Sequence, residues 1–257
     1  MSKVDFHIHT YCSDGELSPE QVVRRFKQKG YEKIAITDHD GTSGVMRAIE
    51  EGRRIGITVV KGVEMTTGFL YEELNKIVEL HILGYNMDLN FPDFVQANSE
   101  SMKYRRERNE RIFKALEERG TPVSREDVMK EGSGDFAGKP DFVRAFRKNN
   151  IEFEDPWEFL DSIKRDRISS QKAIEVIKKA GGIPVLAHPK KIRAIEPSSD
   201  EFYTRLEYII SSLKPYGLMG LECFHPSANE EETKKLLKIA EKNGLIISRG
   251  SDFHREP

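Results

Sequence analysis

Short runs of apolar, β-branched residues alternate with amphipathic stretches over the first third of the chain. Strands are predicted near residues 4–8, 33–37 and 58–63, with a helix in each interval. The first helix opens with a capping box at Ser18 and Gln21, has Pro19 at its first position and closes at Gly30. The second follows Ser43 and is expected to end by Gly52. This β-α-β alternation favours a parallel sheet.

The pattern changes after an apolar run at residues 77–85. Residues 91–167 are mostly charged and helical, with the longest predicted helix at 101–120 and a helix cap at Ser124. Alternation then resumes, with helices at 170–180, 201–213 and 229–243 and strands at 183–187, 218–223 and 245–248. We therefore expect an α/β, barrel-like core from residues 1–90 and 168–257, with residues 91–167 inserted as a helical lid domain.

Composition limits the classes of function. The 257 residues carry 33% charged residues that nearly cancel to a net charge of -2, so a broad basic surface for duplex DNA is not expected and phosphate binding must be local. The two cysteines, Cys12 and Cys223, form no C-x-x-C pair, and no stretch approaches the roughly 20 apolar residues that span a bilayer. We expect a cytoplasmic protein without membrane contact, in which Cys12 is a small buried filler.

Every histidine of the chain falls at or just beyond the end of a predicted strand. The set is His7, His9, His39, His81, His188, His225 and His254. In a parallel barrel these strand ends open onto one face, where active sites are built. Any one such histidine is more often a capping or hydrogen-bonding residue, and the convergence of the whole set is what favours a binding site.

Carboxylates share the strand-end positions. Residues two apart on a strand project to the same side, so His7 with His9 and Asp252 with His254 each direct two ligands to one place. Asp14, Asp38, Asp40 and Glu64 also lie at predicted strand ends. Imidazole with carboxylate is the ligand mixture that suits zinc, manganese or iron, so the sequence predicts a cluster of metal ligands.

The chain resembles the PHP (polymerase and histidinol phosphatase) superfamily in successive segments along nearly its whole length. The segments are DFHIHTYCSDG, ITDHDGTSG, VKGVEMTT, ELHILGYNMD, GGIPVLAHP, GLECFHPS and GSDFH. They most resemble the nucleotide phosphatase and 5'-3' exoribonuclease branch. The resemblance implies a distorted (β/α)7 TIM-like barrel with a helical insertion and two or three divalent ions, with manganese, iron or zinc as the metal.

The resemblance also implies a role for each residue. One metal would be held by His7, His9, Glu64 and Asp252, a second by Glu64, His81 and His188, and a third by Asp14, His39 and His254. Asp14 stands where some relatives have a histidine, so the third site can differ in metal. Asp40 and Asp38 are interpreted as partners that orient imidazoles, and Asp40 is counted with His225 as catalytic.

Such a centre suits phosphate ester hydrolysis. Three divalent ions bring about +6 and three carboxylates about -3, which leaves roughly +3 to meet a phosphate dianion. Clustered metals lower the pKa of bound water towards about 7, so a metal-bridging hydroxide can attack phosphorus without a protein nucleophile. His225 is left over from the metal assignment. It could protonate the leaving group, contact phosphate, or serve only as a structural hydrogen-bonding residue.

Substrate choice is expected to lie in the helical insertion. Arg105, Arg108, Asn109 and Lys139 resemble lid positions near substrate, although a solvated face is the slightly preferred interpretation of these four residues. Lys190 and Lys191 are alternative phosphate contacts. The predicted substrate is a small nucleotide such as a nucleoside 3',5'-bisphosphate, or short RNA. A cyclic sugar-phosphate diesterase, a histidinol phosphatase, and a proofreading or regulatory metal-binding module of an unidentified partner are the alternatives.

Overall fold

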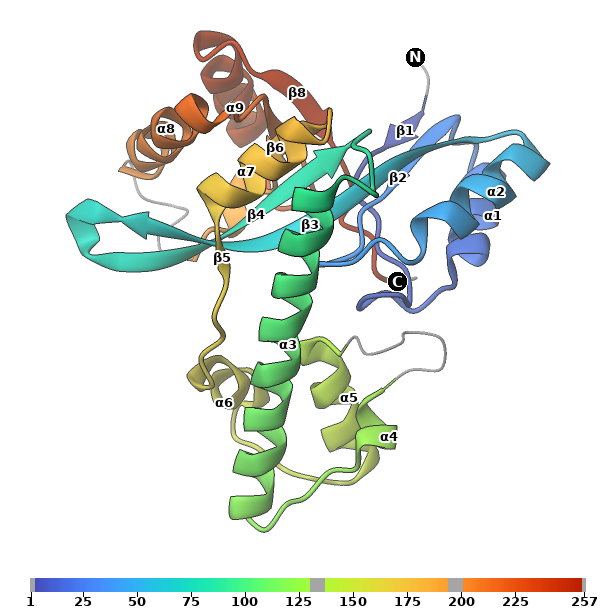
Figure 1. The fold of residues 1–257 in the computed structure, drawn as a ribbon, viewed down its shortest axis with the longest axis vertical. Coiled ribbons are helices and arrows are strands. Elements are labelled where there is room, and N and C mark those ends of the chain that lie inside the picture. Colours follow the sequence, from blue (N-terminus) through green and yellow to red (C-terminus); the bar gives the residue numbers. More distant parts are fainter. Residues whose placement is uncertain (1–2, 130–136, 194–200, 256–257) are drawn as a thin grey trace.

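A mixed sheet forms the centre of the molecule. The computed structural model describes residues 3–129, 137–193 and 201–255, and within them the sheet has eight strands (Figure 1). Their order is β1 (Val4–Asp5), β2 (Lys33–Ile36), β3 (Thr58–Tyr71), β4 (Lys76–Tyr85), β6 (Ile183–Leu186), β7 (Gly220–Phe224) and β8 (Ile246–Arg249), with β5 (Ile168–Ser169) paired to β3. The α/β character expected from the sequence is confirmed.

The helices that follow the strands lie close to their predicted positions in the sequence. They are α1 (Pro19–Gln28), α2 (Val45–Ile55), α7 (Ser170–Lys179), α8 (Glu201–Leu213) and α9 (Glu230–Lys242). The predicted capping box opens α1, where Ser18 Oγ accepts from Gln21 N at 3.2 Å and Gln21 Oε1 accepts from Ser18 N at 2.8 Å. Strand and helix identity was therefore readable here from local patterning and capping chemistry.

The expected end of α2 at Gly52 is wrong, because the helix continues to Ile55 and stops before Gly56 in the left-handed conformation. A Cβ on Gly52 would lie 2.6 Å from Val59 Cγ2. Gly52 is therefore a point of close packing between the helix and β3, and it does not terminate the helix.

The expectation of a parallel sheet is wrong at its middle. β3 extends eight residues past its predicted end, turns through η1 (Glu72–Leu74), and pairs antiparallel with β4, which is itself antiparallel to β6. No α-helix separates β3 from β4, so the chain makes a long hairpin that projects from the sheet (Figure 1). As a result Glu64 and His81 lie within strands, with His81 opposite Thr66, and neither lies at a strand end.

The segments that follow β1 and β8 lie beside each other. Phe6 N donates to Arg249 O at 3.0 Å and His9 N donates to Phe253 O at 2.9 Å. Ile8 and Phe253 form an isolated parallel bridge. The segment after β1 therefore runs alongside the segment after β8, which places His7 and His9 next to Asp252 and His254.

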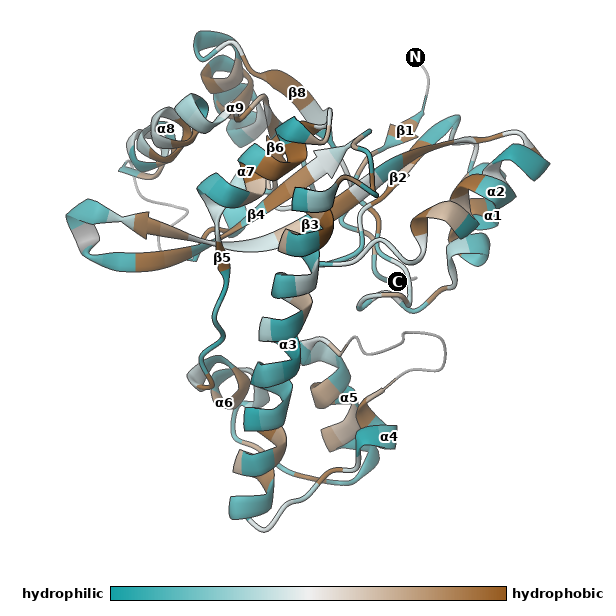
Figure 2. Ribbon diagram, in the orientation of Figure 1, coloured by the Kyte–Doolittle hydropathy of each residue, from teal (hydrophilic) through white to brown (hydrophobic). Residues whose placement is uncertain are grey.

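The central part of the chain forms a helical region below the sheet (Figure 1). It contains α3 (Pro92–Glu118), α4 (Arg125–Val128), α5 (Lys139–Lys148) and α6 (Pro156–Ser162). Their apolar side chains, including Ile112, Phe142 and Phe146, form a cluster of their own. Figure 2 shows mostly hydrophilic residues along α3 and hydrophobic stretches within the strands. Among the described residues, no helix is both long and apolar enough to cross a membrane.

Candidate metal centre

The ligands expected from the sequence converge at one place. His7 and His9 come from the extended segment after β1, His39 follows β2, and His188 follows β6. The structure brings together all the residues proposed to bind metal: His7, His9, Asp14, His39, Glu64, His81, His188, Asp252 and His254. Segments up to 247 residues apart thus meet at one buried point, as the spacing of the histidines predicted.

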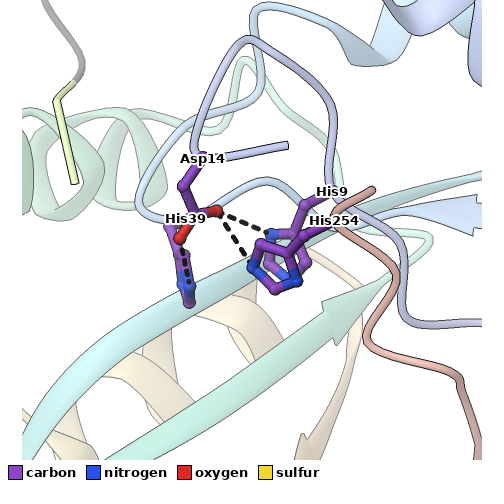
Figure 3. Close-up of side chains that lie close together, drawn as sticks. All are labelled: His9, Asp14, His39 and His254. Atoms are coloured by element: carbon purple, nitrogen blue, oxygen red, sulfur yellow. Dashed lines mark ion pairs between the residues drawn. The ribbon is translucent and has the colours of Figure 1, made fainter. Parts of the chain in front are cut away.

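Asp14 lies among three imidazoles (Figure 3). Its Oδ1 is 3.2 Å from His254 Nε2 and 3.7 Å from His9 Nδ1, and its Oδ2 is 3.6 Å from His39 Nε2. These four residues form one of three groups whose ligand atoms all lie within 4.8 Å of one another. The other groups are His7, His9, Glu64 and Asp252, and His39, Glu64 and His81.

Glu64 is the centre of the arrangement. Its Oε2 lies within 3.2 Å of ring nitrogens of His7, His9 and His39, and its Oε1 lies within 2.9 Å of ring nitrogens of His81 and His188. The two oxygens therefore face two different sets of imidazoles. A carboxylate placed in this way can bridge two cations.

The donor atoms fit divalent ions. Four of them, His7 Nε2, His9 Nε2, His39 Nδ1 and Glu64 Oε2, are buried and make no hydrogen bond within the described part of the chain. Buried polar atoms without partners are rare because their desolvation is costly. Lone pairs of nitrogen and oxygen that converge in this way suit zinc, manganese or iron.

The electrostatics point in the same direction. Burial alone would lower the pKa of His9, but the carboxylates of Asp252 and Glu64 raise it to about 10. Burial alone would raise the pKa of Glu64, whereas the charges of His39, His7 and His81 lower it well below its usual range. The buried carboxylates therefore attract positive charge strongly at this point.

Glu222 supports two of the ligands and was missed by the sequence analysis. Its Oε1 lies 3.0 Å from His7 Nδ1, and its Oε2 accepts a hydrogen bond of 2.7 Å from the amide of His188. A carboxylate on the far nitrogen of an imidazole fixes the orientation of the ring. The available signal was a single acidic residue within the otherwise apolar strand β7.

Asp38 and Asp40 hold other groups. Asp38 accepts hydrogen bonds from Thr10 N at 2.7 Å and from Ser13 Oγ at 2.7 Å, so it fixes the loop that carries Asp14. Neither carboxylate makes a hydrogen bond to an imidazole within the described residues. The orienting contacts come instead from Glu222 and from Glu79, whose Oε1 lies 3.5 Å from His81 Nε2.

His225 has a defined tautomer. Its Nδ1 accepts a hydrogen bond of 3.0 Å from the amide of Ser227, so in the neutral ring the hydrogen is on Nε2. That nitrogen lies 3.5 Å from Asp252 Oδ2. The arrangement favours a hydrogen-bond donor to Asp252 or to a phosphate oxygen over a proton donor to the leaving group.

Three of the four residues proposed for the lid are buried, so the solvated-face alternative is wrong for Arg105, Arg108 and Asn109. Arg108 Nη2 and Asn109 Nδ2 donate to Ala137 O at 3.1 and 3.2 Å, and Arg108 Nε donates to Asn109 Oδ1 at 2.9 Å. Arg105 forms an ion pair with Asp40. This ion pair connects α3 to Asp40, the residue that directly follows His39.

The lysines differ in their contacts. Lys139 pairs with Asp161. Lys190 is buried, pairs with Glu232 at 2.7 Å, and lies 4.2 Å above the ring of Phe202. Lys191 Nζ lies 2.5 Å from Asp252 Oδ2. Among these three lysines, Lys191 is the one in contact with a proposed metal ligand.

Comparisons with known proteins agree with this geometry. The family model described as PHP domain matches residues 5–179. The chain belongs to the PHP domain family. It is 28% identical to the 5'-3' exoribonuclease Rnm of Escherichia coli over 98% of this chain and 85% of that protein. It is 27% identical to the 3',5'-nucleoside bisphosphate phosphatase of Chromobacterium violaceum over 99% and 88%.

A further relative and a solved structure are also similar to this chain. The chain is 26% identical to the phosphoribosyl 1,2-cyclic phosphate 1,2-diphosphodiesterase of Eggerthella lenta over 97% of this chain and 93% of that protein. A solved structure from Bifidobacterium adolescentis, assigned as a metal-dependent phosphoesterase, superposes with a TM-score of 0.80 at 28% identity, covering 98% and 88%. With its buried histidine and carboxylate groups, the chain is a metal-dependent phosphoesterase of the PHP family.

Proposed function

We propose that this PHP phosphoesterase hydrolyses phosphate esters of nucleotides, as a nucleoside 3',5'-bisphosphate phosphatase or as a 5'-3' exoribonuclease on short RNA. The observation that carries the proposal is the placement of buried Arg105, which pairs with Asp40 next to His39, with buried Arg108 one turn further along α3. A nucleotide with two phosphates, or an RNA end, presents one phosphate to the metals and a second to the arginines. The names of the relatives from E. coli and C. violaceum support both readings.

Two or three divalent ions, drawn from manganese, iron and zinc, would be held by three sets of ligands that overlap the three groups described above. His7, His9, Glu64 and Asp252 would hold one, Glu64, His81 and His188 a second, and Asp14, His39 and His254 a third. Bound cations supply neutralisation of phosphate charge and activation of water. The shared position of Glu64 explains why we assign it the bridging role.

The chain's own residues would orient the ester. His225 presents a hydrogen on Nε2, and Lys191 presents an ammonium group, both within reach of Asp252. They are placed to donate hydrogen bonds to oxygens of the scissile phosphate. Glu222 and Glu79 would keep the rings of His7 and His81 in fixed orientations while the substrate changes.

We propose that residues 91–167 act as a lid domain on a core of residues 1–90 and 168–257. The separate apolar cluster of α3 to α6 supports this division. We also propose that the sheet closes into a distorted (β/α)7 barrel, a reading supported by the hydrogen bonds between the segments after β1 and after β8. The free thiols of Cys12 and Cys223 are consistent with action in the cytoplasm.

A second candidate is hydrolysis of a cyclic sugar phosphate. It is favoured by the relative from E. lenta, which matches 97% of this chain. The same centre could open a cyclic diester and then remove the resulting monoester, because both steps displace an oxygen from phosphorus. A histidinol phosphatase, and a regulatory metal-binding module, have no comparable observation in their favour.

A hydrolysis assay over a defined panel tests the proposal. The metal-loaded protein is given adenosine 3',5'-bisphosphate, a short 5'-phosphorylated RNA, ribose 1,2-cyclic phosphate 5-phosphate, histidinol phosphate and p-nitrophenyl phosphate. We expect kcat/KM to be at least about tenfold higher for the bisphosphate or the RNA than for histidinol phosphate and p-nitrophenyl phosphate, which have one phosphate, since a second phosphate contact adds about 1.5–3 kcal/mol. The cyclic ester, which also carries a second phosphate, is expected to be cleaved more slowly than the bisphosphate or the RNA. A preference for the cyclic ester would replace this function by the second candidate.

A further inference from the structure

We infer that Arg165 and Arg105 form an anion subsite beside the metal centre, held in place by Asp40, that takes a phosphate group of the substrate other than the one being cleaved. The inference rests on the proposed function and adds a residue, Arg165, that lies outside the long helix α3. It also assigns Asp40 a positioning role. Phosphate is the ligand chemistry, whether it belongs to a nucleoside bisphosphate or to an RNA backbone.

Two chain segments deliver guanidinium groups to one oxygen. Arg165 lies in the segment that links α6 to β5 and runs beside α3 (Figure 1). Its side chain is only 8% exposed, and its Nη1 lies 3.4 Å from Asp40 Oδ2. Arg105, from α3, forms its ion pair with the same oxygen. Each guanidinium has five N–H donors, so a shared single oxygen leaves donors of Arg165 available to a second anion.

Asp40 is built to hold this pair. Its Oδ1 accepts a hydrogen bond of 2.8 Å from Thr66 N, and its amide donates to Glu64 O at 2.9 Å. Its backbone has φ of 51°, a left-handed conformation that non-glycine residues adopt rarely. The strained residue is thus fixed to the strand that carries Glu64, which sets the distance between the arginines and the metal ligands.

The surrounding charge favours an anion. Arg105, Arg108 and Arg165 are all nearly buried, and the hydrogen bonds of Arg108 go to two neutral oxygens, Asn109 Oδ1 and Ala137 O. Burial and then the like charge of Arg105 lower the pKa of Arg165 to about 10. Buried like charges are costly unless a counter-charge is near. Asp40 supplies one counter-charge to Arg105 and Arg165, and a phosphate dianion would supply two more.

The subsite lies on one identifiable side of the centre. Asp40 follows His39 directly in the sequence. The negative charge of Glu79 acts on Arg165, and Glu79 Oε2 accepts a hydrogen bond of 2.7 Å from Arg167 Nε. The other oxygen of Glu79, Oε1, lies 3.5 Å from His81 Nε2. His39 and His81 belong to the same candidate metal group. The arginines therefore flank the His39, Glu64 and His81 group, where a phosphate next to the scissile one would reach them.

The test removes the Arg165 charge and compares it with a neighbour. Arg165→Met keeps the aliphatic stem, Arg165→Lys keeps a charge without the planar fork, and Lys164→Met removes an exposed charge from the same segment. Substrates are adenosine 3',5'-bisphosphate, a short 5'-phosphorylated RNA and p-nitrophenyl phosphate, at matched metal content. We expect Arg165→Met to raise KM at least tenfold for the bisphosphate, the RNA or both, with kcat little changed.

The control results separate this inference from the proposed function. Hydrolysis of p-nitrophenyl phosphate should stay within about threefold of wild type in Arg165→Met, and Lys164→Met should match wild type on every substrate. Arg165→Lys should recover part of the lost affinity. Equal losses on all three substrates, or identical kinetics for Arg165→Met and Lys164→Met, would overturn the subsite while leaving phosphoesterase activity in place.

A binding measurement decides the matter if none of these esters is cleaved. Adenosine 3',5'-bisphosphate and, as a one-phosphate control, inorganic phosphate are titrated calorimetrically into metal-loaded wild type, Arg165→Met and Lys164→Met, with thermal melting to confirm that each is folded. We expect at least tenfold weaker bisphosphate binding in Arg165→Met alone, with inorganic phosphate binding unchanged. Equal bisphosphate affinity in the two variants would exclude the subsite.

Discussion

Replacing Glu64 by Gln is expected to remove most of the bound metal and to lower kcat/KM for phosphate esters by more than about a hundredfold. Loss of a residue that only orients a metal ligand lowers metal affinity or activity by at most about a hundredfold. Glu64 is itself a proposed metal ligand, so its loss should have a larger effect. Gln keeps the shape but loses the charge, and its NH2 group cannot coordinate a cation. Because the two oxygens of Glu64 face separate sets of imidazoles, two metal sites should weaken together.

Metal analysis and steady-state kinetics on the same preparation check this result. Glu51→Gln is the matched control, because Glu51, like Glu64, is a buried glutamate with charged partners. Its partners are Arg24 and Arg54, and it lies on α2, outside the ligand groups. The control should keep full metal and full activity. A Glu64→Gln protein with unchanged metal content and activity would rule out the bridging assignment.

Gly250→Ala is expected to disable the centre although it replaces none of the proposed ligands. A Cβ at this position would lie 2.1 Å from His7 Cβ and 2.8 Å from Glu222 Oε1, so one of these groups must move. Overpacking of this kind costs about 1–3 kcal/mol or more in stability. Displacement of His7 from Glu222 should also lower metal affinity about 10-fold to 100-fold. Metal titration and thermal melting measure the two effects.

Gly41→Ala is the companion variant. It lies close to His39, but the nearest atom to its new Cβ is His39 O at 3.6 Å, an ordinary contact distance. We expect nearly normal metal binding and melting temperature. If Gly250→Ala behaved like Gly41→Ala, the close approach between Gly250 and His7 would not be important for the centre.

Most of the secondary structure could be predicted from local sequence patterns. The Ser18 capping box, the periodicity of α7 to α9 and the strand runs before them were all readable, because each depends on nearby residues. The hairpin of β3 and β4 was not. Its residues alternate like any strand pair, and only long-range pairing decides that β4 runs back against β3 and then against β6.

The convergence of the residues proposed to bind metal was predictable for a different reason. Histidine is an uncommon residue, so its spacing in the sequence is informative. In any extended segment the H-x-H and D-x-H pairs project to the same side, so a cluster could be predicted before the fold was known. Glu222 and Arg165 were not visible, since acidic residues and arginines are abundant in this chain. Their roles depend on burial and on partners far away in sequence, namely His7 for Glu222 and Asp40 for Arg165.

Metal stoichiometry, measured by elemental analysis together with hydrolysis before and after chelation, tests the central claim most directly. We predict two or three equivalents of manganese, iron or zinc per chain, loss of phosphoesterase activity on chelation, and its return when one of these metals is restored. Less than one equivalent after mild purification and reconstitution, or activity that chelation leaves unchanged, would contradict the account.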